Sequence, residues 1–295
     1  TNLIVENLPS KRKYPFRASV NISFGCNNFC TYCIVPYVRG REKSRDSREI
    51  VKECEALVQD GVKEIMLLGQ NVNSYGLDRE EELSFPELLR TVAKIPGLRR
   101  IRFMTPNPKD FSEELLSVIQ ENENICNHIH LPLQSGSTAI LKRMNRHYTK
   151  EEFKEAVDCI RIAFPLAAIT TDVIVGFPGE TEEDFQESMR FISEIGFYDL
   201  HIFKYSRRKG TRADEMKEQI TEKVKKERSK ILLDLALKDS EKFRKQFIGK
   251  ISEVLIEEVR ELEGEMYYTG FNKEYIRFYV PLQKDRALEI GGVYP

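Results

Sequence analysis

The sequence predicts an α/β domain with parallel strands, followed by a long helix and a small all-β domain. Between residues 18 and 215, short β-rich runs alternate about six times with helical stretches, and this alternation is typical of parallel strands joined by right-handed crossovers. A long charged stretch from 221 to 247 has the sparse apolar positions of a helix. After Gly249 the residues alternate or cluster as β-branched and aromatic runs between turns, which predicts antiparallel strands.

The predicted strands of the α/β domain are short, apolar runs. They cover residues 18–23, 64–68, 101–104, 129–133, 169–175 and 200–205. Two of the helices between them begin with a predicted capping box, at Asp46-Ser-Arg-Glu49 and Thr149-Lys-Glu-Glu152, because a side-chain oxygen and an acidic residue three positions later can satisfy the first amides of a helix. The series predicts an α/β barrel or an open sheet. In both folds, ligands bind at the carboxyl ends of the strands.

The β-rich runs after Gly249 cover residues 251–256, 265–270 and 275–280. They predict a small antiparallel barrel or sheet. A further strand is expected at 291–295, where this sequence stops, so we expect the domain to be cut short.

Composition and charge limit the classes of function. The chain has 295 residues, 41% of them hydrophobic, and its 46 Lys and Arg against 47 Asp and Glu give a net charge of −1. Affinity for nucleic acid would therefore have to come from local basic clusters. The apolar runs fall far short of the ~20 residues that a membrane span needs. We expect no membrane association, and a reducing, cytoplasmic location, because the six cysteines do not resemble a disulfide framework.

Three cysteines follow the first predicted strand directly. Cys26, Cys30 and Cys33 lie within one short turn of chain, so all three thiols can face a common point. A four-iron cluster normally takes four cysteine thiolates, and three would leave one iron open to a small ligand. The spacing therefore favours an iron–sulfur cluster with a reactive open position.

Other interpretations of the triplet are weaker. A structural zinc site needs four ligands, and the nearest histidine is His128, about a hundred residues away. A thioredoxin-like pair at Cys30 and Cys33 would leave Cys26 without a role. The other cysteines have no ligand-like neighbours, and we expect Cys54 to lie in the core; these are Cys54, Cys126 and Cys159.

Segments rich in glycine and amide side chains follow three other predicted strands. They are Gly69-Gln70-Asn71, Gln134-Ser-Gly-Ser137 and Gly176-Phe-Pro-Gly-Glu180. Because the carboxyl ends of parallel strands meet at one edge, these segments and the cysteine loop predict a single active site. The glycines can also be simple turn residues.

Together these motifs resemble the radical S-adenosylmethionine (SAM) superfamily and, within it, the methylthiotransferases. The resemblance covers essentially the whole chain and is closest to members that act on N6-isopentenyladenosine in tRNA. Four blocks carry it, namely Cys30 to Arg45, Leu68 to Gly76, His130 to Ser137 and Val175 to Thr181. It implies a linker remnant at 1–17, a partial (β/α)6 radical SAM barrel at 18–215, a connecting helix at 216–248 and a TRAM-like β-barrel at 249–295.

The resemblance also implies the chemistry. Cys26, Cys30 and Cys33 would hold one [4Fe–4S] cluster, and its open iron would bind SAM, whose reductive cleavage yields a radical that removes hydrogen from C2 of the modified adenosine at position 37. A methylthio group then replaces that hydrogen. No residue beyond the cluster ligands is assigned to catalysis. Further SAM contacts are implied for Gly69, Gln70, Asn71, Gln134, Gly176 and Glu180.

One departure from the family concerns the source of sulfur. Full-length methylthiotransferases carry three further cysteines in an amino-terminal domain, and these hold a second cluster. Nothing in this sequence matches that domain, so we expect a fragment that holds one cluster and cleaves SAM without completing sulfur insertion unaided. The implied partners are the anticodon stem-loop of tRNA and an electron donor such as flavodoxin or ferredoxin.

Basic residues form three clusters. One isolated cluster would be solvated charge, but three clusters that follow strand ends in a near-neutral protein favour a track for RNA phosphates. They are Arg39, Arg41, Lys43, Arg45 and Arg48; Lys142, Arg143, Arg146 and His147; and Lys204, Arg207, Arg208, Lys209 and Arg212. Aromatic residues of the β-domain either stack on bases or fill its core. These are Tyr267, Tyr268, Phe271, Tyr275 and Phe278.

Three alternative functions stay open. Segments 205–211 and 270–275 favour a methylthiotransferase acting on N6-threonylcarbamoyladenosine in tRNA. A methylthiotransferase acting on a ribosomal protein is disfavoured by the basic clusters. A non-catalytic RNA-binding module with a structural cluster is the alternative from another class.

Overall fold

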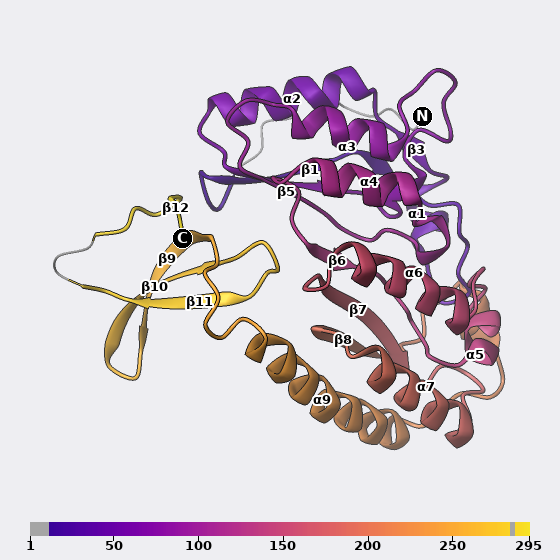
Figure 1. Ribbon diagram of the computed structural model, residues 1–295. Coiled ribbons are helices and arrows are strands. Elements are labelled where there is room, and N and C mark those ends of the chain that lie inside the picture. Colours follow the sequence, from indigo (N-terminus) through magenta and orange to yellow (C-terminus); the bar gives the residue numbers. More distant parts are fainter. Residues whose placement is uncertain (1–11, 284–286) are drawn as a thin grey trace.

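Six parallel strands form the centre of the molecule in the computed structural model, which describes residues 12–283 and 287–295 (Figure 1). The strands are β1 (Arg17–Asn21), β4 (Glu64–Leu68), β5 (Arg100–Phe103), β6 (His128–His130), β7 (Ala168–Val175) and β8 (Asp199–Lys204). They pair as two sheets in the orders β1-β4-β5 and β6-β7-β8. The sheets meet where Ile101 pairs with Ile125, just before β6.

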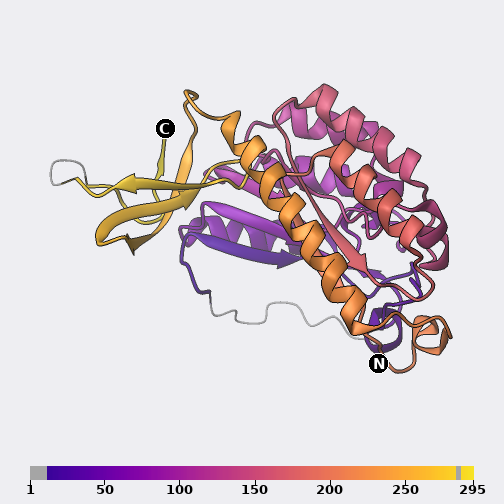
Figure 2. The same ribbon diagram turned by 90° about the horizontal axis from the view of Figure 1, so that it is seen from below.

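A helix follows each of these strands, and together the helices cover the outer face of the strands (Figures 1 and 2). They are α2 (Ser47–Gln59), α3 (Phe85–Ala93), α4 (Glu113–Glu121), α6 (Lys150–Ala163), α7 (Glu182–Ile195) and α9 (Glu222–Lys245). The predicted partial (β/α)6 barrel is confirmed. The strand predicted at 129–133 ends earlier, at His130, because the N–H of Leu133 donates to the side-chain hydroxyl of Thr171 at 2.8 Å and not to a backbone carbonyl of β7.

Helix capping matches the sequence in one case and differs in another. Thr149 and Glu152 form the predicted capping box of α6. Asp46 caps α2 by accepting from the N–H of Arg48 at 3.0 Å, and among the described residues the expected reciprocal bond from Glu49 is not formed. The prediction of a box at α2 was therefore wrong, although Asp46 is the N-cap.

Alternate residues along each strand point outward into the core beneath the helices. Ile65, Leu67 and Ile101 are fully buried there, and Cys54 of α2 joins the same core, as predicted. The intervening residues of the strands face the inside of the barrel. Many of these are polar, and they determine the chemistry of the interior.

The carboxyl-terminal part forms a small antiparallel sheet in the order β11-β10-β9-β12. Its strands are β9 (Val254–Leu262), β10 (Glu265–Phe271), β11 (Arg277–Pro281) and β12 (Val293–Tyr294). The predicted all-β character is confirmed. The first strand begins three residues later than expected, and the short β12 lies in the expected 291–295 segment and pairs with β9.

Two arginines of β5 join this sheet to the barrel at the amino ends of the strands. Arg102 is 1% exposed; its Nε donates to Glu64 at 3.0 Å, and its two terminal nitrogens donate to the carbonyls of Asn272 and Lys273 at 2.8 and 2.9 Å. Arg100 donates to the carbonyl of Phe271 at 2.7 Å. The turn between β10 and β11 therefore closes the end of the barrel at which the strands begin.

The aromatic side chains of that turn are used in this interface. Phe271 and Tyr275 stack with ring centroids 4.5 Å apart, and Tyr275 also stacks on His128 of β6 at 5.0 Å. Tyr268 and Phe278 pack in the core of the β-domain. Of the five aromatics considered for base stacking, these four are engaged inside the protein.

Replacing Arg102 by Met is expected to lower the free energy of unfolding by about 3–5 kcal/mol, because Glu64 and two carbonyls lose their buried donor. Arg99→Met is the matched control. Arg99 is more than half exposed and pairs with Glu253 at 3.3 Å, so its loss should cost at most about 1 kcal/mol. Equilibrium urea unfolding followed by circular dichroism measures both changes. Equal changes in the two variants would contradict a structural role for the buried arginine.

Candidate cluster site at the carboxyl ends of the strands

The cysteine loop begins where β1 ends and is closed at its base by a short strand pair. β2 (Ser23–Phe24) and β3 (Lys43–Ser44) pair antiparallel, and the loop between them contains the triplet and the short helix α1 (Val35–Arg39). Gly25 has φ +74°, and a Cβ there would lie 2.2 Å from the carbonyl oxygen of Arg41. The loop therefore requires glycine immediately before Cys26.

The three thiols are partly withdrawn from water. Cys30 is 8% exposed, and Cys26 and Cys33 are half-buried. Burial raises the pKa of both the Cys26 and the Cys33 thiol. The thiolate form of this loop therefore needs a cationic partner, and a bound metal supplies one because coordination deprotonates a thiol.

The donor set of the loop favours a cluster over a single metal ion. A structural zinc site is closed by four ligands. Among the described residues, the side chains grouped closely enough to hold one ion are His130, Asp172 and His201, and none of the three cysteines belongs to that group. Three thiols with no fourth ligand grouped beside them in the described chain fit a cluster that leaves one iron open.

A segment from across the barrel holds the cysteine loop in place. The side-chain amide of Asn145 donates to the carbonyls of Asn28 and Phe29 at 3.2 and 3.1 Å. The hydroxyl of Thr31 donates to the carbonyl of Arg143 at 3.0 Å. We call residues 143–146 the clamp segment.

Arg146 of the clamp segment contacts a cysteine directly. One terminal nitrogen lies 3.5 Å from the Cys30 sulfur and the other donates to the carbonyl of Pro132 at 3.4 Å. Sequence reasoning placed Arg146 in an RNA-binding cluster, because a local pattern of basic residues does not reveal a partner that lies 116 positions earlier. The guanidinium places positive charge beside a prospective thiolate.

The segment after β4 lies beside the cysteine loop. A Cβ on Gly69 would lie 2.6 Å from the hydroxyl oxygen of Ser23. Asn71 is 4% exposed, and its amide donates to Asp110 at 3.2 Å and accepts from the N–H of Asn107, also at 3.2 Å. These bonds join η1 (Val72–Ser74) to η2 (Pro108–Asp110). Gln70 is exposed.

The segments after β6 and β7 contain the other predicted cofactor contacts. Gln134 is buried at φ +68°. Gly176 has φ +70°, and a Cβ there would meet the side chain of Lys225 at 2.3 Å. Glu180 accepts from the N–H of Gly176 at 2.7 Å and from Arg228 at 2.6 Å. Glu180, like Asn71, is thus engaged by protein groups and shapes its loop.

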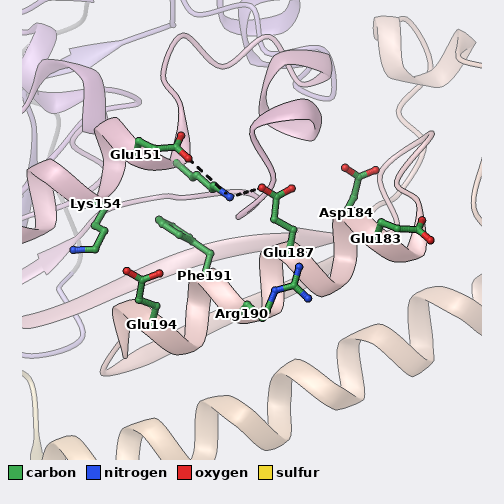
Figure 3. Close-up of a pocket in the computed structure, with 9 residues that line it drawn as sticks. Glu151, Lys154, Glu183, Asp184, Glu187, Arg190, Phe191 and Glu194 are labelled. Atoms are coloured by element: carbon green, nitrogen blue, oxygen red, sulfur yellow. Dashed lines mark hydrogen bonds and ion pairs between the residues drawn. The ribbon is translucent and has the colours of Figure 1, made fainter.

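A separate groove lies on the outer surface between α6 and α7 (Figure 3). It has a volume of about 710 Å³, and Lys150 and Glu187 form an ion pair across it. Its lining is mostly charged and includes none of the site residues predicted from the sequence. In the described part of the chain, no helix is both long and apolar enough to cross a membrane.

A family model described as the radical SAM superfamily matches residues 20–192. The chain is 54% identical over 266 residues to a tRNA-2-methylthio-N(6)-dimethylallyladenosine synthase of Lachnoclostridium phytofermentans, covering 90% of this chain and 58% of the relative. It is 53% identical to the protein of the same name from Clostridium tetani, covering 86% and 56%. The chain thus spans little more than half the length of these curated relatives.

Solved structures resemble the chain in fold alone. Coproporphyrinogen III oxidase (HemN) from Escherichia coli, a radical SAM enzyme, gives a TM-score of 0.58 at 15% identity, covering 77% of this chain and 53% of that one. The radical SAM methyltransferase TsrM from Kitasatospora setae gives 0.56 at 19% identity, covering 67% and 38%.

Replacing Arg146 by Met is expected to weaken retention of iron in the cysteine loop. The change removes the donor to Cys30 and the bond to Pro132, and loss of such a supporting contact typically costs at least about ten-fold in metal affinity. After anaerobic reconstitution, the variant should lose iron to a chelator at about ten-fold lower chelator concentration than the unchanged chain.

The control is Arg39→Met, which removes an exposed basic residue from the last turn of α1. It should retain iron like the unchanged chain. Equal retention by the Arg146→Met variant would show that the clamp segment does not support the site.

Proposed function

We propose that this chain, which belongs to the radical SAM superfamily, is the SAM-cleaving part of a tRNA methylthiotransferase. The reaction would add a methylthio group to C2 of N6-isopentenyladenosine at position 37. The observation that carries the proposal is the partly buried three-thiol loop at the carboxyl edge of a partial (β/α)6 barrel. The chain is 54% identical to a tRNA-2-methylthio-N(6)-dimethylallyladenosine synthase, in whose name dimethylallyl denotes the same isopentenyl group, and this identity supports the choice of substrate.

The residues of the loop fit a [4Fe–4S] cluster that leaves one iron for the amino and carboxylate groups of SAM. When bound, the cluster supplies the electron that cleaves the sulfonium of SAM to give a 5′-deoxyadenosyl radical. Cys26, Cys30 and Cys33 would hold the irons, and Arg146 would stabilise the negative charge on the Cys30 sulfur. Burial of the loop by the clamp segment would limit the access of water to the site.

The side chains that remain for SAM are few. Gln70 is exposed after the end of β4, and the buried Gln134 pairs with Val173 near the end of β7, so both lie at the edge of the sheet where the ligand would bind. The backbones of Gly69 and Gly176 would allow its close approach, since neither carries a side chain. Asn71 and Glu180 would act by fixing these loops.

Sulfur would come from outside this sequence. Cys54 and Cys126 are buried and Cys159 is exposed, and among the described residues they form no common ligand group. A second cluster would therefore lie in the part of the relatives that this chain does not cover. Completion of the reaction would require that part.

Exposed basic residues around the site would contact the anticodon stem-loop. They include Arg39, Arg41, Lys142, Arg208 and Lys209. Arg45 is instead buried and donates to Glu53 at 2.8 Å, and Arg146 serves the cysteine loop. An electron donor such as flavodoxin or ferredoxin would reduce the cluster in the cytoplasm.

N6-threonylcarbamoyladenosine remains the second candidate substrate. Two segments favour it. Segment 270–275 contacts the barrel and docks the β-domain on it, so its sequence is explained by that interface and does not indicate the substrate. Segment 206–210 is exposed and is therefore the part that can influence the choice of substrate. Nucleoside analysis of tRNA from a strain that lacks the gene distinguishes the two, since only the true product should disappear.

The reconstituted chain is expected to form 5′-deoxyadenosine from SAM under anaerobic conditions with dithionite. Cys30→Ala should abolish this product, because the loop would keep only two thiolates. Cys159→Ala, which removes an exposed cysteine of α6, should leave it unchanged. Tight RNA binding without 5′-deoxyadenosine would instead support a non-catalytic RNA-binding module.

A further inference from the structure

We propose that the interior of the barrel contains a second metal site, for a divalent first-row ion such as Zn²⁺, formed by His130, Asp172 and His201. The three residues lie on the neighbouring strands β6, β7 and β8. Asp172 and His201 are register partners, and His130 is paired with Thr170, two residues before Asp172. All three therefore occupy inward-facing positions on adjacent strands.

The donor atoms already have the spacing of a coordination shell. One donor from each residue lies within 4.8 Å of the other two. Asp172 Oδ1 is 3.4 Å from His130 Nε2 and 3.1 Å from His201 Nδ1. Ligands at about 2.1 Å from a tetrahedral zinc ion lie about 3.4 Å from one another. An ion would therefore require little movement of the strands.

A strand neighbour holds the ring of His130 in the orientation that coordination requires. His130 Nδ1 lies 3.0 Å from the hydroxyl oxygen of Thr170, which leaves Nε2 directed at Asp172. Metal-binding histidines almost always use their second nitrogen in such a bond. The Thr170 hydroxyl also lies 3.2 Å from His128 Nε2, so this supporting contact is fixed from two sides.

The exposure of the ligands indicates an open site. The side chain of His130 is 3% exposed, that of Asp172 is 23% and that of His201 is 49%. Three protein ligands with one accessible side are typical of zinc sites that bind water or another ligand in the remaining position, whereas structural sites are closed by four. Two imidazoles and one carboxylate favour Zn²⁺ or Fe²⁺ over Mg²⁺ or Ca²⁺.

This site is independent of the SAM chemistry proposed above, because it uses only nitrogen and oxygen donors and none of the three cysteines. Without an ion, the same residues would form a hydrogen-bonded His–Asp–His network. The two alternatives differ in whether the purified chain retains metal. Zinc binding therefore distinguishes them.

The test uses the cluster-loaded chain, so that the cysteine thiols are occupied. It is equilibrated anaerobically with Zn²⁺, desalted and analysed for zinc and iron. One zinc per chain is expected in addition to the cluster iron. Asp172→Asn and His201→Gln should lose it, and Thr170→Val should bind zinc about ten-fold more weakly. His147→Gln, which changes an exposed histidine outside the barrel interior, is the matched control and should retain zinc.

Two further readouts complete the test. Circular dichroism checks that the variants are folded, which is expected for His201→Gln because His201 is half exposed. Cobalt substituted for zinc should add no thiolate charge transfer to the spectrum of the cluster-loaded chain measured without cobalt. No zinc in the unchanged chain, equal zinc in all variants, or a thiolate signature from cobalt would overturn the proposal.

Discussion

The hold of the clamp segment on the cysteine loop is the interaction on which the site depends. Between Phe24 and Val35 the chain has no regular secondary structure, yet it must position three thiols and keep them partly out of water. Buried backbone carbonyls need donors, and Asn145 supplies them for two consecutive peptide groups. Each bond contributes only about 1 kcal/mol, but together they connect the loop after β1 to the segment just before α6.

The barrel interior extends from the cysteine loop, at the carboxyl ends of the strands, to the β-domain at their amino ends. Arg102 and Glu64 form a buried ion pair near the amino ends of the strands, and the turn from β10 to β11 covers it. Further along the strands, toward their carboxyl ends, lie His128 and then His130 with Asp172. Polar groups therefore continue from the closed lower end toward the open upper edge. Such an interior suits a ligand that enters at the carboxyl ends of the strands, beside the cysteine loop. The small β-domain closes the opposite end of the barrel.

Much of this was predictable from the sequence. The positions of the strands, the place of the cysteine loop after the first strand and the cap at Thr149 follow from local patterns, because each depends on residues close together in the chain. Arg146 and Arg102 could not be assigned, since their partners Cys30 and Asn272 lie 116 and 170 positions away. Glu180 was taken for a cofactor contact because of its place after β7; its buried bond to Arg228 depends on how α9 packs.

Electron paramagnetic resonance of the reduced, reconstituted chain tests most directly whether the loop holds a cluster with an open iron. A single [4Fe–4S]⁺ signal is expected, and addition of SAM should change it, because SAM would bind the iron that lacks a cysteine ligand. Cys26→Ala should remove the signal. A spectrum that SAM leaves unchanged, or signals from two clusters in this chain, would contradict the assignment.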